Sequence, residues 1–167
     1  NLRKALNVIH DGFFLSKYKE LHLFIAGTGL VGSSLVKQLL KQQQTLLRDY
    51  NLNINLLGLI NSRKMLIHGK PITLEKYREA LETDGERSDI HVFMAQMTKL
   101  NLRNSVFVDC TANAVVAQTY GSALEKYVSV VTASKIACAS DYSYYHMLKT
   151  MANERGVRFM YETTVGA

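Results

Sequence analysis

A short stretch with three glycines in six residues has the clearest chemical use in this chain. Gly27-Thr28-Gly29-Leu30-Val31-Gly32 fits the pattern G-x-G-x-x-G, directly after an apolar run and at the start of a helical apolar period. In such a turn the first glycine bends the chain, the second admits a pyrophosphate to the backbone, and the third lets the helix pack on the strand. The free amides at the helix start then face the phosphate charge. We predict a dinucleotide site built from Gly27 to Gly32; the alternative is a tight corner that holds no ligand.

The end of the next apolar run, residues 53–61, bears on the choice of dinucleotide. An NAD site uses an Asp or Glu there to bond the ribose hydroxyls. Between Gly32 and Lys64 the single acidic residue is Asp49, which precedes this run. Arg63 and Lys64 follow the run instead and can pair with a 2′-phosphate, Arg63 through a fork of donors. The pattern favours NADP(H) and leaves NAD(H) open; alternatively, both cations are solvated loop residues.

Two further candidates for cofactor contact lie at the ends of later apolar runs. Thr111 ends the run at residues 105–111, and Lys135 comes after residues 127–134. Ligands of open parallel sheets bind at the carboxyl edge, where both residues would lie. Thr111 can contact the ribose or nicotinamide, and Lys135 can orient the cofactor or a substrate carboxylate. The alternatives are helix capping for Thr111 and Asn113, and a bare surface lysine for Lys135.

These candidates need a framework of alternating strands and helices. Apolar strands are expected at residues 21–27, 53–61, 105–111, 127–134 and 156–164, with helices between them. Strands that are apolar on both faces indicate a parallel sheet covered on each side. The sequence therefore predicts an α/β fold, a doubly wound (Rossmann-type) parallel sheet with helices on both faces. Residues 1–19 do not follow this alternation of strands and helices, and we interpret them as a linker from an upstream region. Residues 20–167 are expected to form the NAD(P)-binding domain.

The helices carry recognisable ends and apolar faces. Thr73, Ser88 and Ser140 are expected to cap the segments that begin near them, and Gly156 is expected to end the last helix. One helix is expected to hold Val116, Tyr120 and Leu124 on a single apolar face.

Composition narrows the class of protein. The chain of 167 residues is 47% hydrophobic and 20% charged, as in ordinary globular domains. Its net charge of +6 is scattered, so we expect neither nucleic-acid binding nor membrane binding. Cys110 and Cys138 lack a nucleophile motif and are assigned to packing, and a reduced, cytoplasmic location is the simple expectation.

Five pieces of the chain together resemble the homoserine dehydrogenase family, from about residue 21 to residue 167. They are "GTGLVG", "NSRKML", "DCTA", "VVTASK" and "YETTVGA". The leading "NLRKALNVIHDGFFLS" is similar to the junction in bifunctional aspartokinase–homoserine dehydrogenases. The resemblance implies NAD(P)-linked interconversion of L-homoserine and L-aspartate 4-semialdehyde, on the route to threonine and methionine.

The resemblance also implies roles for single residues. Thr28 to Val31 match the family's pyrophosphate contact, Thr111 its ribose or nicotinamide contact, and Lys135 a lysine near cofactor and substrate. Ser134 stands where family members usually have Asn. The resemblance implies a monovalent cation (sodium) site with three residues as ligands: Glu162, Val165 and Ala167.

The family keeps its substrate-binding acids and catalytic lysine in a following domain, so no catalytic residue is expected in this chain. The full-length enzyme is expected to be a homo-oligomer. The alternative function is a Rossmann-type module that senses nucleotides and transfers no hydride.

Overall fold

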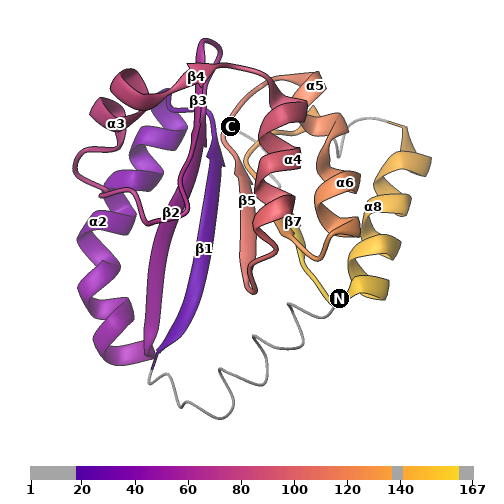
Figure 1. Cartoon of the computed structure of the whole chain (residues 1–167). Coiled ribbons are helices and arrows are strands. Elements are labelled where there is room, and N and C mark those ends of the chain that lie inside the picture. Colours follow the sequence, from indigo (N-terminus) through magenta and orange to yellow (C-terminus); the bar gives the residue numbers. More distant parts are fainter. Residues whose placement is uncertain (1–17, 137–140, 162–167) are drawn as a thin grey trace.

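A twisted seven-stranded sheet forms the centre of the molecule (Figure 1). The computed structural model describes residues 18–136 and 141–161. The strands stand in the order β4-β3-β2-β1-β5-β6-β7. Their bounds are β1 Lys19–Ala26, β2 Leu52–Ile60, β3 Lys64–Ile67, β4 Glu86–Arg87, β5 Ser105–Asp109, β6 Ser129–Thr132 and β7 Phe159–Tyr161.

Strand β1 is the point where the chain changes direction across the sheet. It pairs in parallel with β2 on one side and with β5 on the other. The chain first builds β2, β3 and β4 on one side, and then crosses to build β5, β6 and β7 on the other. Ligands of such sheets bind outside the carboxyl ends of the strands at this reversal. The predicted doubly wound fold is confirmed.

Helices cover both faces of the sheet. Helices α2 (Leu30–Tyr50) and α3 (Tyr77–Asp84) lie on one face, and four others lie on the opposite face (Figure 1). The four are α4 Ile90–Leu100, α5 Ala114–Gln118, α6 Tyr120–Glu125 and α8 Tyr142–Arg155. Strand β1 contributes side chains to the core on both faces of the sheet, because successive side chains alternate in direction. Leu23 and Ile25 face α2, whereas Phe24 and Ala26 face α4.

A row of aromatic rings runs through the core beneath α4 and α6. Neighbouring ring centroids lie 6.0 to 6.5 Å apart, in tilted or edge-on arrangements that favour such pairs. The row joins β1, α4, β5, α6 and β7 through Phe24, Phe93, Phe107, Tyr120 and Phe159. Room for its first pair comes from Gly58, where a Cβ would stand 2.6 Å from Phe24 Cδ1 and 3.0 Å from Phe93 Cζ.

The sheet departs from the prediction at one edge. Strands β3 and β4, which the sequence analysis did not predict, are antiparallel to their neighbours. Only residues 61–63 connect β2 to β3, and a parallel connection needs a dozen residues or more. The short link therefore forces an antiparallel return, and the sheet is mixed although mostly parallel.

The predicted starts of α4 and α3 were wrong. Helix α4 is capped by Asp89, whose carboxylate accepts from the amides of His91 and Val92, and not by Ser88. Helix α3 begins at Tyr77, after Lys76, and not near Thr73.

At the end of α8, the last helix of the described residues, the prediction was right, because Gly156 caps it in a left-handed conformation (φ 64°). At the start of α8 the prediction was wrong, because the cap is Asp141, whose carboxylate accepts from the Ser143 amide at 3.3 Å, and not Ser140, which itself lies outside the described residues.

The single helix predicted around residues 116–124 is two short helices that meet at Thr119, which ends α5 and precedes α6. Val116, Tyr120 and Leu124 are all buried, as the apolar pattern predicted. The pattern thus identified the buried face and missed the break.

Substitution of Gly58 tests the packing under the aromatic row. Gly58→Ala should lower the free energy of unfolding by about 1–3 kcal/mol, because the new methyl overlaps the Phe24 and Phe93 rings. A Cβ added at exposed Gly69 would meet no atom within 4 Å, so Gly69→Ala should change stability by less than about 1 kcal/mol. Urea unfolding of both variants measures the difference, and equal effects would contradict this account of Gly58.

Candidate functional site

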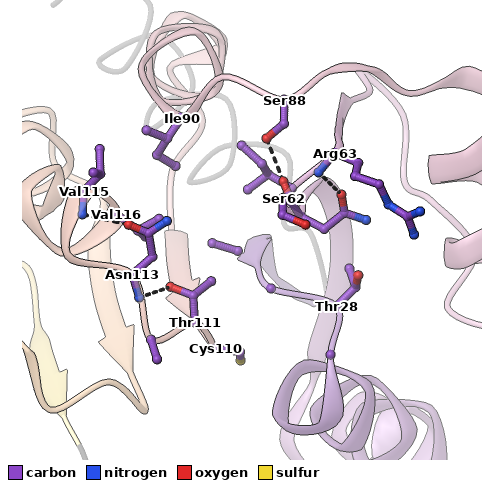
Figure 2. Close-up of a pocket in the computed structure, with 16 residues that line it drawn as sticks. Thr28, Ser62, Arg63, Ser88, Ile90, Cys110, Thr111, Asn113, Val115 and Val116 are labelled. Atoms are coloured by element: carbon purple, nitrogen blue, oxygen red, sulfur yellow. Dashed lines mark hydrogen bonds between the residues drawn. The ribbon is translucent and has the colours of Figure 1, made fainter.

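A cavity of about 780 Å³ opens at the carboxyl ends of β1, β2 and β5. Three loops and the first residues of α4 and α5 line it. Figure 2 shows Thr28 and Arg63 on one side of the cavity, with Thr111, Asn113 and Val115 on the other. Its position, at the chain reversal around β1, is where the fold class places ligands.

The glycine turn after β1 permits a very close approach of backbone to backbone. Gly27 has a φ of 93°, and a Cβ on it would stand 2.9 Å from the Cys110 carbonyl oxygen. At Gly32 a Cβ would stand 1.9 Å from the Gly27 carbonyl oxygen. Gly29, by contrast, faces open space and has nothing within 4 Å. The fold therefore requires glycine at positions 27 and 32. At Gly29 the absence of a side chain leaves the space beside the backbone open to the cavity.

The start of α2 provides hydrogen-bond donors beside that open space. Its N-cap is Gly29, which offers no side-chain hydrogen bond, and its first turn contains no acidic residue. Free amides and the positive end of the helix dipole favour an anion at such a terminus. Gly27, Thr28 and Gly29 line the cavity. Leu30, Val31 and Gly32 are not among its lining residues, although the amides of the first turn belong to them.

The turn that carries Arg63 is held by hydrogen bonds from two directions. Asn61 Oδ1 accepts from the backbone amides of Arg63 and Lys64, each at 2.8 Å. Ser88 donates its hydroxyl to the Asn61 carbonyl at 2.6 Å (Figure 2). The Ser88 amide donates to the Arg63 carbonyl at 3.0 Å. Arg63 is exposed and lines the cavity. Its backbone is thus fixed while its guanidinium remains available to a ligand.

Lys64 takes a different direction from Arg63. Its Nζ lies 3.3 Å from Glu82 Oε2 and also contacts the Glu82 carbonyl. Lys64 begins β3 and is not among the residues that line the cavity. The structure therefore brings Arg63 to the site and turns Lys64 toward α3.

The loop after β5 shapes the opposite wall. Thr111 lines the cavity, and its hydroxyl accepts from the Asn113 amide at 3.2 Å. Asn113 caps α5 by accepting from the Val115 amide at 2.9 Å (Figure 2). The capping alternative is thus correct for Asn113, which also lines the cavity.

Lys135 is exposed in the loop after β6 and is not among the lining residues of the cavity. It follows Ser134, a buried residue whose amide donates to Thr132 Oγ1 at 2.9 Å. Glu162, Val165 and Ala167, the predicted cation ligands, lie outside the described residues. Within the part of the chain that is described, no three His, Cys, Asp or Glu side chains form a metal-binding group.

Sequence reasoning missed a buried carboxylate beneath the cavity. Asp109 ends β5, is fully buried, and accepts from the Thr111 amide at 2.7 Å. Burial raises its pKa, while hydrogen bonds from Tyr120 and Thr111 oppose that rise. A single Asp closing an otherwise apolar strand was the available signal.

Ser88 and Cys110 were also missed as part of the cavity wall. Among the described residues, no helix is long and apolar enough to cross a membrane.

Comparison with known families decides what this cavity belongs to. Residues 27–162 match the family model described as homoserine dehydrogenase, NAD binding domain, which covers well over half of the chain. The chain belongs to the homoserine dehydrogenase family. Both the predicted family and the predicted cofactor domain are confirmed, and the matched segment includes the whole cavity wall apart from Ala26.

Relatives of this homoserine dehydrogenase domain are bifunctional proteins. The chain is 36% identical to bifunctional aspartokinase/homoserine dehydrogenase 2, chloroplastic, of Arabidopsis thaliana, over 98% of the chain and 18% of that protein. It is 34% identical to the bifunctional aspartokinase/homoserine dehydrogenase of Haemophilus influenzae, over 98% of the chain and 20% of that protein. The chain thus spans about a fifth of the length of these relatives.

Solved homoserine dehydrogenases share the fold. A hyperthermophilic archaeal homoserine dehydrogenase in complex with NADPH matches with a TM-score of 0.70 and 22% identity, over 88% of this chain and 45% of that one. The enzyme from Thermoplasma acidophilum matches with a TM-score of 0.65 and 22% identity, over 86% of this chain and 43% of that one.

The Cys110 thiol offers a test of the cavity floor. Burial and the nearby Asp109 charge raise the pKa of Cys110 to about 11, so little thiolate is present at pH 8. In a Cys138→Ser background, alkylation by iodoacetamide at pH 8 should be about 100-fold slower than for free cysteine. The rate should still be rising about tenfold per pH unit at pH 9. A rate that levels off near pH 8.5, as for the urea-unfolded control, would contradict this burial.

Proposed function

We propose that this NAD-binding domain binds NADP(H) in preference to NAD(H), for an enzyme that interconverts L-homoserine and L-aspartate 4-semialdehyde by hydride transfer. The observation that carries the proposal is that Arg63 lines the same cavity as Gly29, the N-cap residue that leads directly into the uncapped start of α2. These are donors for two separate phosphate groups. A dinucleotide with a 2′-phosphate presents both.

The glycine turn fits the pyrophosphate. Free amides of Leu30, Val31 and Gly32 at the start of α2 provide donors, and the absence of a side chain on Gly29 lets the phosphates approach the backbone. Thr28 adds a hydroxyl at the cavity wall. No acidic residue in the first turn of α2 opposes the negative charge.

The preference for NADP(H) rests on Arg63. Its fork of donors suits a phosphate monoester, and its backbone is held by Asn61 and Ser88. The residue after β2 is the neutral Asn61, whose Oδ1 already accepts two amides of the turn. It therefore provides no carboxylate for the ribose hydroxyls of NAD(H). Lys64, paired with Glu82, contributes at most a more distant positive charge.

The nicotinamide half would lie toward the loops after β5 and β6. Thr111 contributes a hydroxyl at the cavity wall, and exposed Lys135 follows the neighbouring strand at the same sheet edge. The bound dinucleotide supplies or takes the hydride. The residues of this chain bind and orient it, and no residue here is assigned a catalytic role.

The remaining parts of the proposal concern the whole enzyme. Residues 1–19 would link to an upstream aspartokinase region and residues 20–167 would form the cofactor domain, with the groups that bind homoserine in a following domain. We propose a homo-oligomeric, cytoplasmic enzyme of threonine and methionine biosynthesis. A sodium site at Glu162, Val165 and Ala167 belongs to the same proposal.

Removal of the Arg63 guanidinium tests the cofactor preference. Arg63→Ala should weaken NADPH binding by about 1.5–3 kcal/mol, because one charge-assisted phosphate contact is lost, and should leave NADH binding nearly unchanged. Arg158→Ala, which removes an exposed arginine just before β7 at the opposite edge of the sheet, is the matched control. Isothermal calorimetry of the three proteins with both cofactors gives the comparison. Equal losses for NADPH and NADH would rule out a phosphate contact.

The chain alone should bind NADPH without oxidising homoserine. Hydride transfer needs the reacting carbons within roughly 3–3.5 Å, and this chain is proposed to hold only the cofactor side of that geometry. Absorbance at the nicotinamide band, with purified chain, NADP⁺ and L-homoserine, measures turnover. Clear turnover would show that Lys135 and its neighbours suffice for the chemistry.

A further inference from the structure

A set of buried polar side chains lies beneath the cavity and is not used by the proposed binding contacts. Asp109 and Thr132 are the last residues of β5 and β6 and are partners in the sheet register. Both are buried, with 0% and 2% exposure, and Ser134 beside them is 6% exposed. Placing polar groups in a core is costly unless each has a hydrogen-bond partner. Among the described residues, no buried side-chain nitrogen or oxygen lacks one.

The hydroxyl of Tyr120 joins the two strand ends. It lies 2.5 Å from Asp109 Oδ2 and 2.9 Å from Thr132 Oγ1. Burial and the Asp109 charge raise the pKa of Tyr120, so the hydroxyl keeps its proton and can donate it to the carboxylate. Because a hydroxyl has a single proton, the Thr132 hydroxyl must donate to Tyr120 in the second bond. Thr132 Oγ1 in turn accepts from the Ser134 amide at 2.9 Å.

These bonds form one chain between two loops. It begins at the Thr111 amide, which donates to Asp109 Oδ1, and it ends at the Ser134 amide. Thr111 lines the cavity, and Ser134 directly precedes Lys135. Tyr120 is itself fully buried and is not among the lining residues, so it cannot touch a ligand.

We infer that Tyr120 is a positioning residue that fixes the Thr111 loop relative to the Lys135 loop through Asp109 and Thr132. This inference rests on the proposed function, in which the nicotinamide half of the dinucleotide lies toward these two loops. The adenosine half lies near Arg63, on the other side of the cavity, and does not depend on the chain of hydrogen bonds. Loss of the Tyr120 hydroxyl therefore affects one half of the ligand selectively.

The test compares two ligands on matched tyrosine variants of the full chain. Tyr120→Phe removes the hydroxyl and keeps the ring. The centroid of that ring lies 6.4 Å from the Phe107 centroid and 6.0 Å from the Phe159 centroid. The control is Tyr144→Phe, which removes a hydroxyl that donates to the Ala117 carbonyl at 2.8 Å and contacts neither strand end. The ligands are NADPH and 2′,5′-ADP, which has the adenosine half and both of its phosphates without the nicotinamide.

The expected result is a selective loss. Tyr120→Phe should weaken NADPH binding about five- to tenfold and change 2′,5′-ADP binding less than about twofold. Tyr144→Phe should change neither by more than about twofold. Thr132→Val should reproduce the loss for NADPH, and Thr132→Ser should restore wild-type binding because it returns the hydroxyl. The threonine pair also decides the question if Tyr120→Phe does not fold.

Two other results would overturn the inference. If Tyr120→Phe weakened the binding of NADPH and of 2′,5′-ADP equally, the hydroxyl would support the domain as a whole. If folded Tyr120→Phe bound NADPH as tightly as the wild type, the hydroxyl would not position the two loops. The proposed function fails in a different way. Wild-type chain that binds neither NADPH nor 2′,5′-ADP would overturn it, and this inference with it.

Discussion

The contact between the first turn of α2 and the peptide of Gly27 is the constraint on which the site depends. A Cβ at Gly32 would stand 1.9 Å from the Gly27 carbonyl oxygen, so the helix starts with its backbone against the strand end. Gly27 also lies against the Cys110 carbonyl, which draws the loop after β5 to the same place. Helix terminus, strand ends and neighbouring loop are therefore fixed together, and the cavity is the space left above them. A side chain at either position would move the α2 amides away from it.

The aromatic row and the buried hydrogen bonds extend this constraint across the sheet. Tyr120 belongs to both, since its ring packs between Phe107 and Phe159 and its hydroxyl reaches Asp109 and Thr132. Apolar packing sets where the ring lies, and the hydrogen bonds set where the strand ends lie relative to it. Because protein interiors are close-packed, a shift of the Tyr120 ring would be passed on to the ends of β5 and β6 and would not be absorbed by empty space. The cavity wall is thus supported from below by elements that never touch a ligand.

Most of the fold could be predicted from the sequence because it follows from local pattern. Apolar runs indicated the five parallel strands, and the glycine spacing indicated the turn before α2. What the pattern missed depends on pairing between distant residues. The antiparallel return of β3 follows from the length of one turn, and the buried hydrogen bonds around Asp109 form only when the sheet brings β6, with Thr132, beside β5. Lys64 was assigned the same role as Arg63 because the two are adjacent, but β3 begins at Lys64 and directs it to Glu82.

Asn61 shows how a single atom can serve both the fold and the choice of cofactor. Its Oδ1 accepts two amides and so holds the turn that carries Arg63, a task that an aspartate oxygen performs equally well. The second side-chain atom is where the two residues differ. An aspartate would place a negative charge beside the cavity, which attracts ribose hydroxyls and repels a 2′-phosphate, whereas the neutral amide does neither. The turn can therefore be kept while the electrostatic preference is reversed. In the proposed function, selectivity for the phosphorylated dinucleotide thus comes from the absence of a charge at Asn61 as much as from its presence at Arg63.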